Sequence, residues 1–69
     1  MAERLGNRLK ERRTDLGLTQ AELAERCGVS RKTVNTVENG VFVPSTLLAL
    51  KLAAALEQNV EQLFFIAND

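Results

Sequence analysis

The chain has 69 residues, of which 45% are hydrophobic and 26% charged, so it can build one modest core and is too apolar to remain disordered. Nine Lys or Arg residues balance nine Asp or Glu residues, and a single Cys27 without any histidine excludes a disulfide framework or a Cys/His metal site within one chain. The apolar stretch 47–56 is interrupted by Lys51 and is far shorter than the ~20 residues that a bilayer requires; no signal peptide is recognisable. We therefore expect a single domain over residues 1–69 in a reducing cytoplasm, with no cofactor, no metal and no membrane partner.

The neutral total conceals an uneven distribution of charge. Residues 1–32 contain eight Lys or Arg against five acidic residues, whereas residues 33–69 contain one Lys against four acidic residues. One half of the chain is therefore cationic and the other anionic. The neutral total predicts weak nonspecific attraction to any polyanion, so that selectivity would depend on local contacts.

The first predicted helix covers Ala2–Leu16. Leu5, Leu9 and Leu16 give it an apolar side, and Gly17 supplies the left-handed residue that commonly ends a helix. Leu18 is expected to pack beneath this helix as the chain turns.

A second helix is predicted from Gln20. Thr19 and Glu22 have the spacing of a capping box, in which each side chain accepts a hydrogen bond from the other residue's backbone amide. Gly28 is expected to end this helix in a left-handed conformation. Cys27, just before it, is expected to be a small buried residue rather than a redox sensor or nucleophile.

A third helix follows after a very short turn. Ser30 is its predicted cap, Val34 and Val37 form its inner side, and Gly40 ends it. Two short helices joined by a tight glycine-containing turn are typical of domains that place the second helix in the major groove of DNA. The outward side chains can pair with base edges or phosphates, and none is acidic. They are Arg31, Lys32, Thr33, Asn35 and Thr36.

The basic pair Arg31 and Lys32 has a plain alternative interpretation. Charged residues on a surface helix are usually only solvated. The preceding capped helix and the Gly-Val-Ser turn favour recognition here, because this arrangement brings the start of the second helix to DNA.

Two further helices are predicted downstream. Pro44 and Ser45 announce one over Thr46–Leu56, and Asn59 with Gln62 marks a short one from Val60 to about Phe64. The sequence thus predicts an all-α fold of five helices, without internal repeats or linkers.

Over nearly its whole length the chain resembles the Cro/C1-type helix-turn-helix family, also called the XRE family of transcriptional regulators. The segments that carry the resemblance are RLKERR, GLTQAELAERCGVSRKTVNTVENG and PSTLLALKLAAAL. The resemblance implies a compact five-helix bundle of the lambda-repressor-like DNA-binding type. Within the family, the chain is most similar to small stand-alone homodimeric repressors.

The same resemblance implies roles for individual residues. Arg31, Lys32 and Thr36 would face bases, and Gln20 and Ser30 would bind phosphate at helix N-termini, where backbone amides favour anions. Thr33 and Asn35 would flank these contacts, and Asn39 would lie near the DNA backbone. The residues implied in DNA binding are Gln20, Ser30, Arg31, Lys32, Thr33, Asn35, Thr36 and Asn39.

Two other features follow from the comparison with the family. Arg13 and Glu38 match a pair that forms a structural salt bridge between the first and third helices. The loop 41–43 (VFV) departs from the family, because this region often carries Lys or Arg for phosphates. Phe42 could pack against a sugar or against the protein.

An apolar surface indicates a second copy of the chain as partner. Phe64, Phe65 and Ile66 are consecutive, so they cannot all point inward from one short helix. A two-fold dimer would present two recognition helices about 34 Å apart and would require a palindromic operator. The alternative is a monomer whose tail folds back. The predicted interface residues are Leu47, Leu50, Ala54, Phe65 and Ile66.

The predicted function is sequence-specific transcriptional regulation, most simply repression by occupying a promoter operator, with activation by contact left open. The rival from another class is a protein-interaction module, such as an antitoxin or adaptor, that binds through the loop 41–43 or the tail. An enzyme is not expected, because the sequence has no histidine, no paired carboxylates at a plausible spacing and no glycine-rich phosphate loop. No small-molecule ligand is evident.

Overall fold

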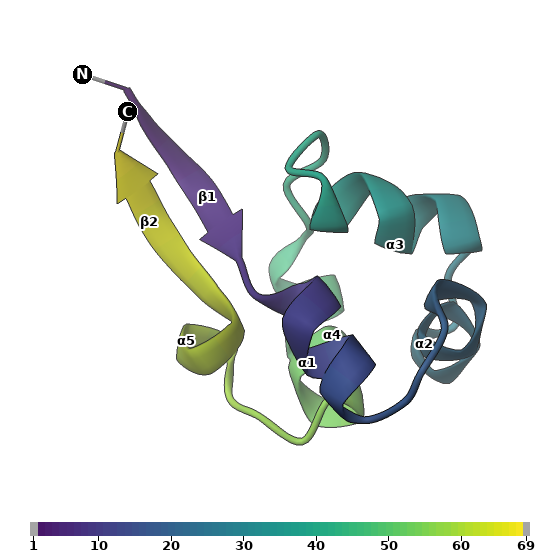
Figure 1. Cartoon of the computed structure of the whole chain (residues 1–69). Coiled ribbons are helices and arrows are strands. Elements are labelled where there is room, and N and C mark those ends of the chain that lie inside the picture. The colour runs from purple at the N-terminus through teal and green to yellow at the C-terminus, as the bar shows by residue number, and fades with distance from the viewer. Residues whose placement is uncertain (1, 69) are drawn as a thin grey trace.

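The structure is a computed structural model that describes residues 2–68. Within that range five helices form the body, and two strands form a ribbon that extends away from it (Figure 1). The elements in chain order are β1 (Glu3–Asn7), α1 (Leu9–Asp15), α2 (Gln20–Cys27), α3 (Arg31–Glu38), α4 (Thr46–Ala55), α5 (Val60–Leu63) and β2 (Phe64–Asn68).

The predicted start of α2 is confirmed. The Thr19 hydroxyl accepts a hydrogen bond from the Glu22 amide at 3.0 Å, and the Glu22 carboxylate accepts one from the Thr19 amide at 2.9 Å. The hydrogen bond from the Thr19 backbone is the main reason why the pKa of Glu22 is lowered, because it favours the ionised carboxylate. Gly17, which precedes this cap, has the expected positive φ of 71°.

The caps of α4 and α5 are also confirmed. The Ser45 hydroxyl accepts from the Leu48 amide at 3.1 Å and begins α4. Asn59 and Gln62 form a reciprocal capping box at the start of α5, which ends at Leu63 because the next residue already has extended backbone angles. These elements were predictable because each cap lies within four residues of its partner.

The first half of the predicted helix over Ala2–Leu16 is wrong, since α1 begins only at Leu9. The Asn7 carboxamide oxygen accepts a hydrogen bond from the Leu9 amide at 3.1 Å, and the Arg8 amide donates to the Leu63 carbonyl at 2.8 Å. Pairing with the C-terminal segment thus replaces the first helical turns. The change is favoured locally by Gly6, a poor helix former.

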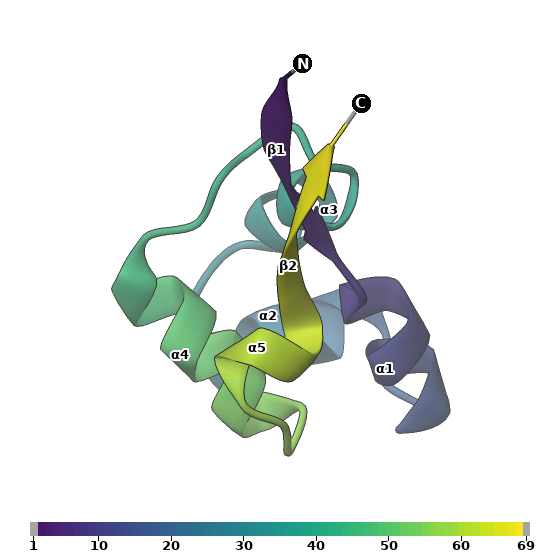
Figure 2. The ribbon, with the colours of Figure 1, turned by 90° about the vertical axis from the view of Figure 1, so that its left-hand side faces the viewer.

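The C-terminal segment likewise forms a strand, so the fold is mostly helical with a small antiparallel sheet rather than strictly all-α. Gly6 lies opposite Phe65 in the ribbon, and a Cβ atom on Gly6 would overlap the Phe65 ring. The Arg8 guanidinium covers the same ring at 4.3 Å from its centroid, a cation–π contact. Alternation along β2 places Phe64 in the core and Phe65 on the other face of the ribbon. Figure 2 shows the ribbon rising above α5, with α1 and α4 on opposite sides.

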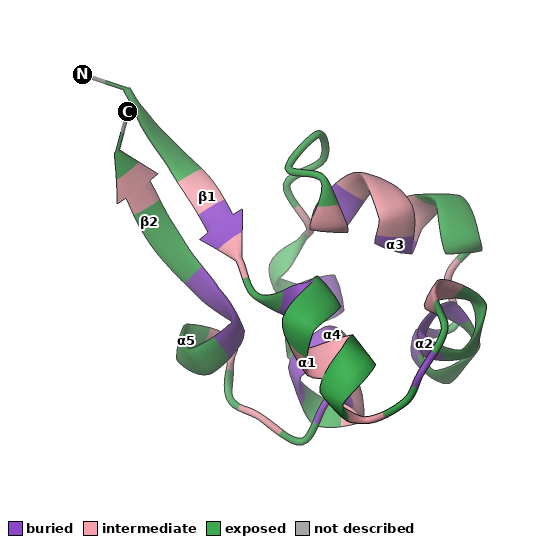
Figure 3. Cartoon of the chain, viewed as in Figure 1, coloured by how far each residue is buried: buried purple, intermediate pink, exposed green. Residues whose placement is uncertain are grey.

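The core lies between the helices, whose exposed residues face outward (Figure 3). Every helix contributes, and full burial of each Leu or Val side chain stabilises the fold by roughly 1.5–3 kcal/mol. Leu18 is buried as predicted. None of the helices described is long and apolar enough to cross a membrane. The largest fully buried side chains are Leu9, Leu23, Val34, Val37, Leu52, Leu56 and Leu63.

Cys27 is buried as predicted, with 3% of its surface exposed. Burial raises the pKa of its thiol. As pH rises, the thiol therefore ionises in the unfolded chain at a lower pH than in the folded protein. The contribution of this group to the free energy of unfolding is full below the ordinary thiol pKa and declines above it.

We expect Cys27 to react with a disulfide reagent such as DTNB at least about a hundredfold more slowly in the native protein than in the guanidinium-unfolded chain. Reaction requires an opening that few molecules populate in a stable domain. Absorbance of the released thiolate measures both rates, with Cys27→Ser as the blank. Equal rates would contradict burial of this thiol.

Candidate nucleic-acid interface

The unit formed by α2, the turn 28–30 and α3 defines the candidate interface. Gly28 has φ 67° and ends α2, and the Val29 amide donates to the Ala24 carbonyl at 3.0 Å. Val29 packs against the core and thereby fixes the corner. The Ser30 hydroxyl accepts from the Thr33 amide at 3.1 Å and begins α3, so both predicted boundaries of the turn are confirmed.

One side of α3 is buried and the opposite side faces solvent. Val34 and Val37 are each 1% exposed, which fixes the rotation of the helix about its axis. Before its last residue the helix carries no carboxylate. We call the solvent-facing side the outward face of α3; it consists of the exposed Arg31 and Lys32 and the half-buried Thr33, Asn35 and Thr36.

Glu38, the single acidic residue of α3, is withdrawn from that face. Its carboxylate accepts hydrogen bonds from Arg13 Nε at 2.7 Å and Arg13 Nη2 at 3.2 Å. The side chains of Glu38 and Arg13 are only 3% and 13% exposed. Arg13 also donates to the Leu18 carbonyl at 2.9 Å. The ion pair implied by the family resemblance is therefore present, and it joins α1 to α3.

A chain of amide side chains extends this network toward the outward face. Gln20 Nε2 donates to the Glu38 carboxylate at 3.0 Å, and Asn35 Nδ2 donates to Gln20 Oε1 at 3.4 Å. Asn39 Nδ2 then donates to Asn35 Oδ1 at 3.2 Å. The spacing of Asn35 and Asn39 is a sequence signal for their bond, but no sequence signal indicates the bonds that Gln20 makes across helices. These amides are thus held in fixed positions beside the cations.

Arg31 and Lys32 differ from these amides in their bonding and exposure. Within residues 2–68, neither side chain forms a hydrogen bond or ion pair, and both are exposed. The hydroxyl groups of Ser30 and Thr33 are 2.9 Å apart and bond to each other. The outward face therefore offers two available cations on a rigid polar surface, an arrangement suited to phosphates and guanine edges.

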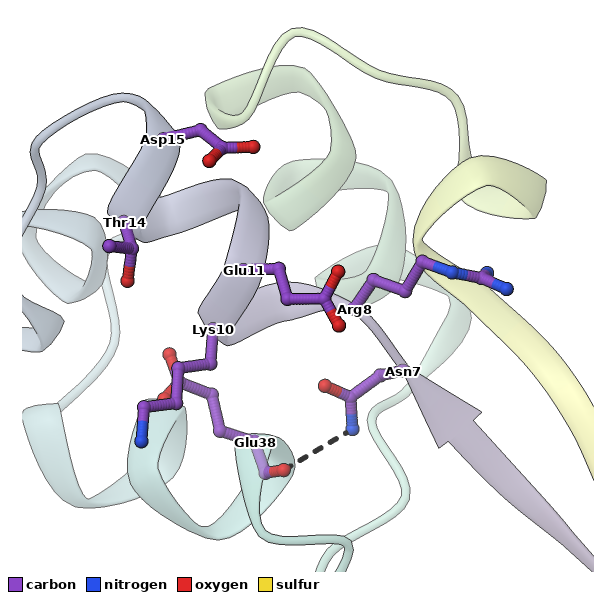
Figure 4. A pocket seen from close by; sticks show the side chains of 7 residues that line it. All are labelled: Asn7, Arg8, Lys10, Glu11, Thr14, Asp15 and Glu38. Carbon is purple, nitrogen blue, oxygen red and sulfur yellow. Dashed lines mark hydrogen bonds between the residues drawn. The ribbon is translucent and has the colours of Figure 1, made fainter.

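A separate hollow lies where α1 and the end of β1 meet the end of α3 (Figure 4). It has a volume of about 540 Å³ and is lined by groups of both charges, including Lys10, Glu11 and Asp15. Asn7 borders it and donates to the Val37 carbonyl at 3.0 Å, which ties β1 to α3. Among the described residues, no group of three or more His, Cys, Asp or Glu could hold a metal ion. The Asn7 hydrogen bond at the edge of this hollow therefore links β1 to the candidate interface.

The residues predicted for a dimer interface are exposed but do not share one flat face. Leu47 and Leu50 are 63% and 54% exposed on the same side of α4 as Ala54. Phe65 and Ile66 point to opposite faces of the ribbon because they are neighbours in a strand. The Phe65 ring already covers Gly6, whereas Ile66 is 69% exposed.

The fold and the site define a helix-turn-helix protein of the DNA-binding class. Residues 9–63 match the family model of the helix-turn-helix, and the chain belongs to the Cro/C1-type, or XRE, family of helix-turn-helix transcriptional regulators. This is a family of transcription regulators and not of enzymes.

Two relatives and one solved structure illustrate the similarity. An uncharacterized HTH-type transcriptional regulator of Methanothermobacter thermautotrophicus is 45% identical over 62 residues, which are 88% of this chain and 90% of the relative. The HTH-type transcriptional regulator YgzD of Bacillus subtilis is 41% identical over 63 residues, 91% of this chain and 96% of the relative. The restriction-modification controller protein C.AhdI of Aeromonas hydrophila has a TM-score of 0.75 and 41% identity over 78% of this chain and 82% of its own.

Proposed function

We propose that this regulator is a homodimeric repressor that inserts α3 into the major groove of a palindromic operator. The observation that carries the proposal is the outward face of α3. Arg31 and Lys32 are exposed there without an anionic partner among residues 2–68, and the carboxylate of Glu38 is bound to Arg13 instead. A cationic helix face without a carboxylate is complementary to phosphates and to the acceptor edges of bases.

The proposed contacts combine the roles that the family resemblance implies with the hydrogen bonds that the side chains already make. Arg31, Lys32 and Thr36 face bases, and Ser30 binds phosphate at the start of α3. The Gln20 side chain is engaged by Glu38 and Asn35. Its phosphate contact therefore uses the backbone amide of Gln20, which lies in the first turn of α2 and has no intrahelical partner. Thr33, Asn35 and Asn39 flank these contacts.

Binding of the operator would be sufficient for repression, because a protein bound across a promoter blocks polymerase sterically. The two-fold symmetry of the proposed dimer requires a palindromic site, and two α3 helices that enter successive major grooves on one side of the duplex read half-sites one turn of DNA, roughly 34 Å, apart. The proposed contact surface combines the exposed side of α4 with Ile66, since Leu47, Leu50 and Ile66 are large apolar side chains that are exposed to water.

The double variant Leu47→Glu, Leu50→Glu is expected to be monomeric at concentrations where the native chain is dimeric. Two carboxylates would be placed in an apolar contact, where an unpaired charge is strongly unfavourable. Sedimentation equilibrium measures the mass. The double variant Val41→Glu, Val43→Glu is the matched control, because it adds the same charge at residues that are 78% and 67% exposed outside the proposed interface. A native monomer, or a double variant that still dimerises, would contradict this interface.

Selection from a pool of random duplexes at fixed, moderate salt tests the function itself. We expect an enriched palindrome after sequencing of the bound fraction. An enriched single half-site would contradict the dimer and leave DNA binding intact. No enrichment would contradict DNA recognition and would favour a protein-interaction module that uses the exposed loop 41–43.

A further inference from the structure

A hollow of about 340 Å³ lies between α3 and the loop that follows it. It borders the outward face of α3, with which it shares Lys32, Thr33 and Thr36. The loop contributes two exposed apolar side chains, Val41 at 78% and Phe42 at 47% exposed. The hollow is lined by Ser30, Lys32, Thr33, Thr36, Val41 and Phe42.

The loop is attached to α3 by its backbone. The amides of Val41 and Phe42 both donate to the Thr36 carbonyl, at 2.9 Å and 3.2 Å. Gly40 has a positive φ of 74°, which turns the chain back at this point. Phe42 is therefore a positioned part of the hollow, although its side chain is half exposed.

The walls of the hollow are mainly apolar in character. The Thr36 hydroxyl donates to the Thr33 carbonyl at 3.0 Å, and the hydroxyls of Ser30 and Thr33 bond to each other. These three hydroxyl groups are thus already engaged within the protein, and methyl groups and the Phe42 ring remain for a ligand. Among the described residues that line the hollow, Lys32 alone is charged, and it is a cation. The matching ligand carries a small apolar group close to an anion.

A thymine in duplex DNA has this combination. Its C5-methyl group projects into the major groove, phosphates flank it, and Thr methyl groups and Phe rings are known partners for it. A methyl group is about the size of a water molecule, whose share of liquid volume is about 30 Å³, so the hollow can accept the methyl-bearing edge of a pyrimidine.

We propose that the hollow between α3 and the loop reads a thymine methyl group in each half-site of the operator, and that Phe42 is the residue that determines this specificity. The proposal rests on the proposed DNA-binding function. It adds a recognition element outside α3 and gives the apolar loop a role in base recognition, where a cationic loop would only hold the DNA backbone.

Replacement of thymine by deoxyuridine, which removes only the methyl group, tests the proposal. Each thymine of the selected operator is replaced in turn, and affinities are measured by fluorescence anisotropy for the native chain and for Phe42→Ala. At one position per half-site we expect the native chain to lose about fourfold in affinity, the change that burial of one methyl group supports. For Phe42→Ala, replacement of thymine by deoxyuridine at that position is expected to cause no loss of affinity.

The controls separate this inference from the function on which it rests. Val43→Ala removes a neighbouring apolar side chain that does not line the hollow, and it should keep the native deoxyuridine profile. Phe42→Leu, which keeps an apolar wall, should retain part of the effect. Identical profiles for the native chain and Phe42→Ala, with specific binding intact, would overturn the inference alone. Absence of specific binding by the native chain would overturn the proposed function and the inference together.

Discussion

Replacement of Arg31 and Lys32 by alanine is expected to lower affinity for the selected operator at least about thirtyfold. A bidentate contact between a cationic side chain and a base contributes about 1–3 kcal/mol of discrimination, and this variant removes two candidate contacts. The fold should be unaffected, because both side chains are exposed and make no bond within residues 2–68. Anisotropy with a labelled operator measures the affinity, and circular dichroism confirms the helical content.

The matched control for this experiment is Arg26→Ala with Lys51→Ala. It removes the same charge from exposed residues of α2 and α4 that border a different hollow. A similar loss in the control would show that the effect comes from net charge alone, which would contradict recognition by α3.

The salt dependence of binding distinguishes the two kinds of contact. Each lost phosphate contact reduces the slope of log K against log salt by about 0.9. A lost base contact instead relaxes sequence preference and leaves that slope nearly unchanged. For at least one of the single variants Arg31→Ala and Lys32→Ala, we expect a relaxed sequence preference with a nearly unchanged salt slope.

Replacement of Arg13 by methionine is expected to destabilise the protein by about 3–5 kcal/mol, because removal of one partner leaves a buried charge without compensation. The Glu38 side chain is 3% exposed and would retain only the Gln20 hydrogen bond. Domains have roughly 0.05–0.15 kcal/mol of stability per residue, so the loss would be a large fraction of the total. Urea denaturation followed by circular dichroism measures the free energy of unfolding.

The double variant Arg13→Met, Glu38→Met is the companion experiment. Apolar replacement of both partners removes the unpaired carboxylate, so we expect it to be more stable than Arg13→Met alone. Recovery should be partial, because the Gln20 side chain and the Leu18 carbonyl each lose a partner. A cost below about 1 kcal/mol for Arg13→Met would show that Glu38 is hydrated and that the network contributes little to the fold.

The sequence was sufficient to predict the parts of the site whose bonds are local. The capping box of Thr19 and Glu22, the left-handed Gly28 and the Ser30 cap each involve residues no more than four apart. Such contacts form within one turn of chain, so residue type and spacing specify them directly. The helix-turn-helix unit and the outward position of Arg31 and Lys32 follow from these bonds and from the spacing of Val34 and Val37.

The two chain ends show why the rest could not be predicted in the same way. The apolar residues Leu5 and Leu9 fit a helical side, but the segment before Leu9 pairs with the C-terminal residues as a strand. The glycine that makes room for the Phe65 ring is explained only by that distant ring. Pairing over such a separation along the chain depends on how the helices bring the ends together.

The sequence by itself therefore determined the helix boundaries around the turn and the cationic face of α3, because each depends on neighbours along the chain. Only the tertiary structure decided the terminal ribbon and the engagement of Gln20 by Glu38. These features join segments that are separate in sequence, and their free energy comes from packing and hydrogen bonds that exist only once the helices are assembled.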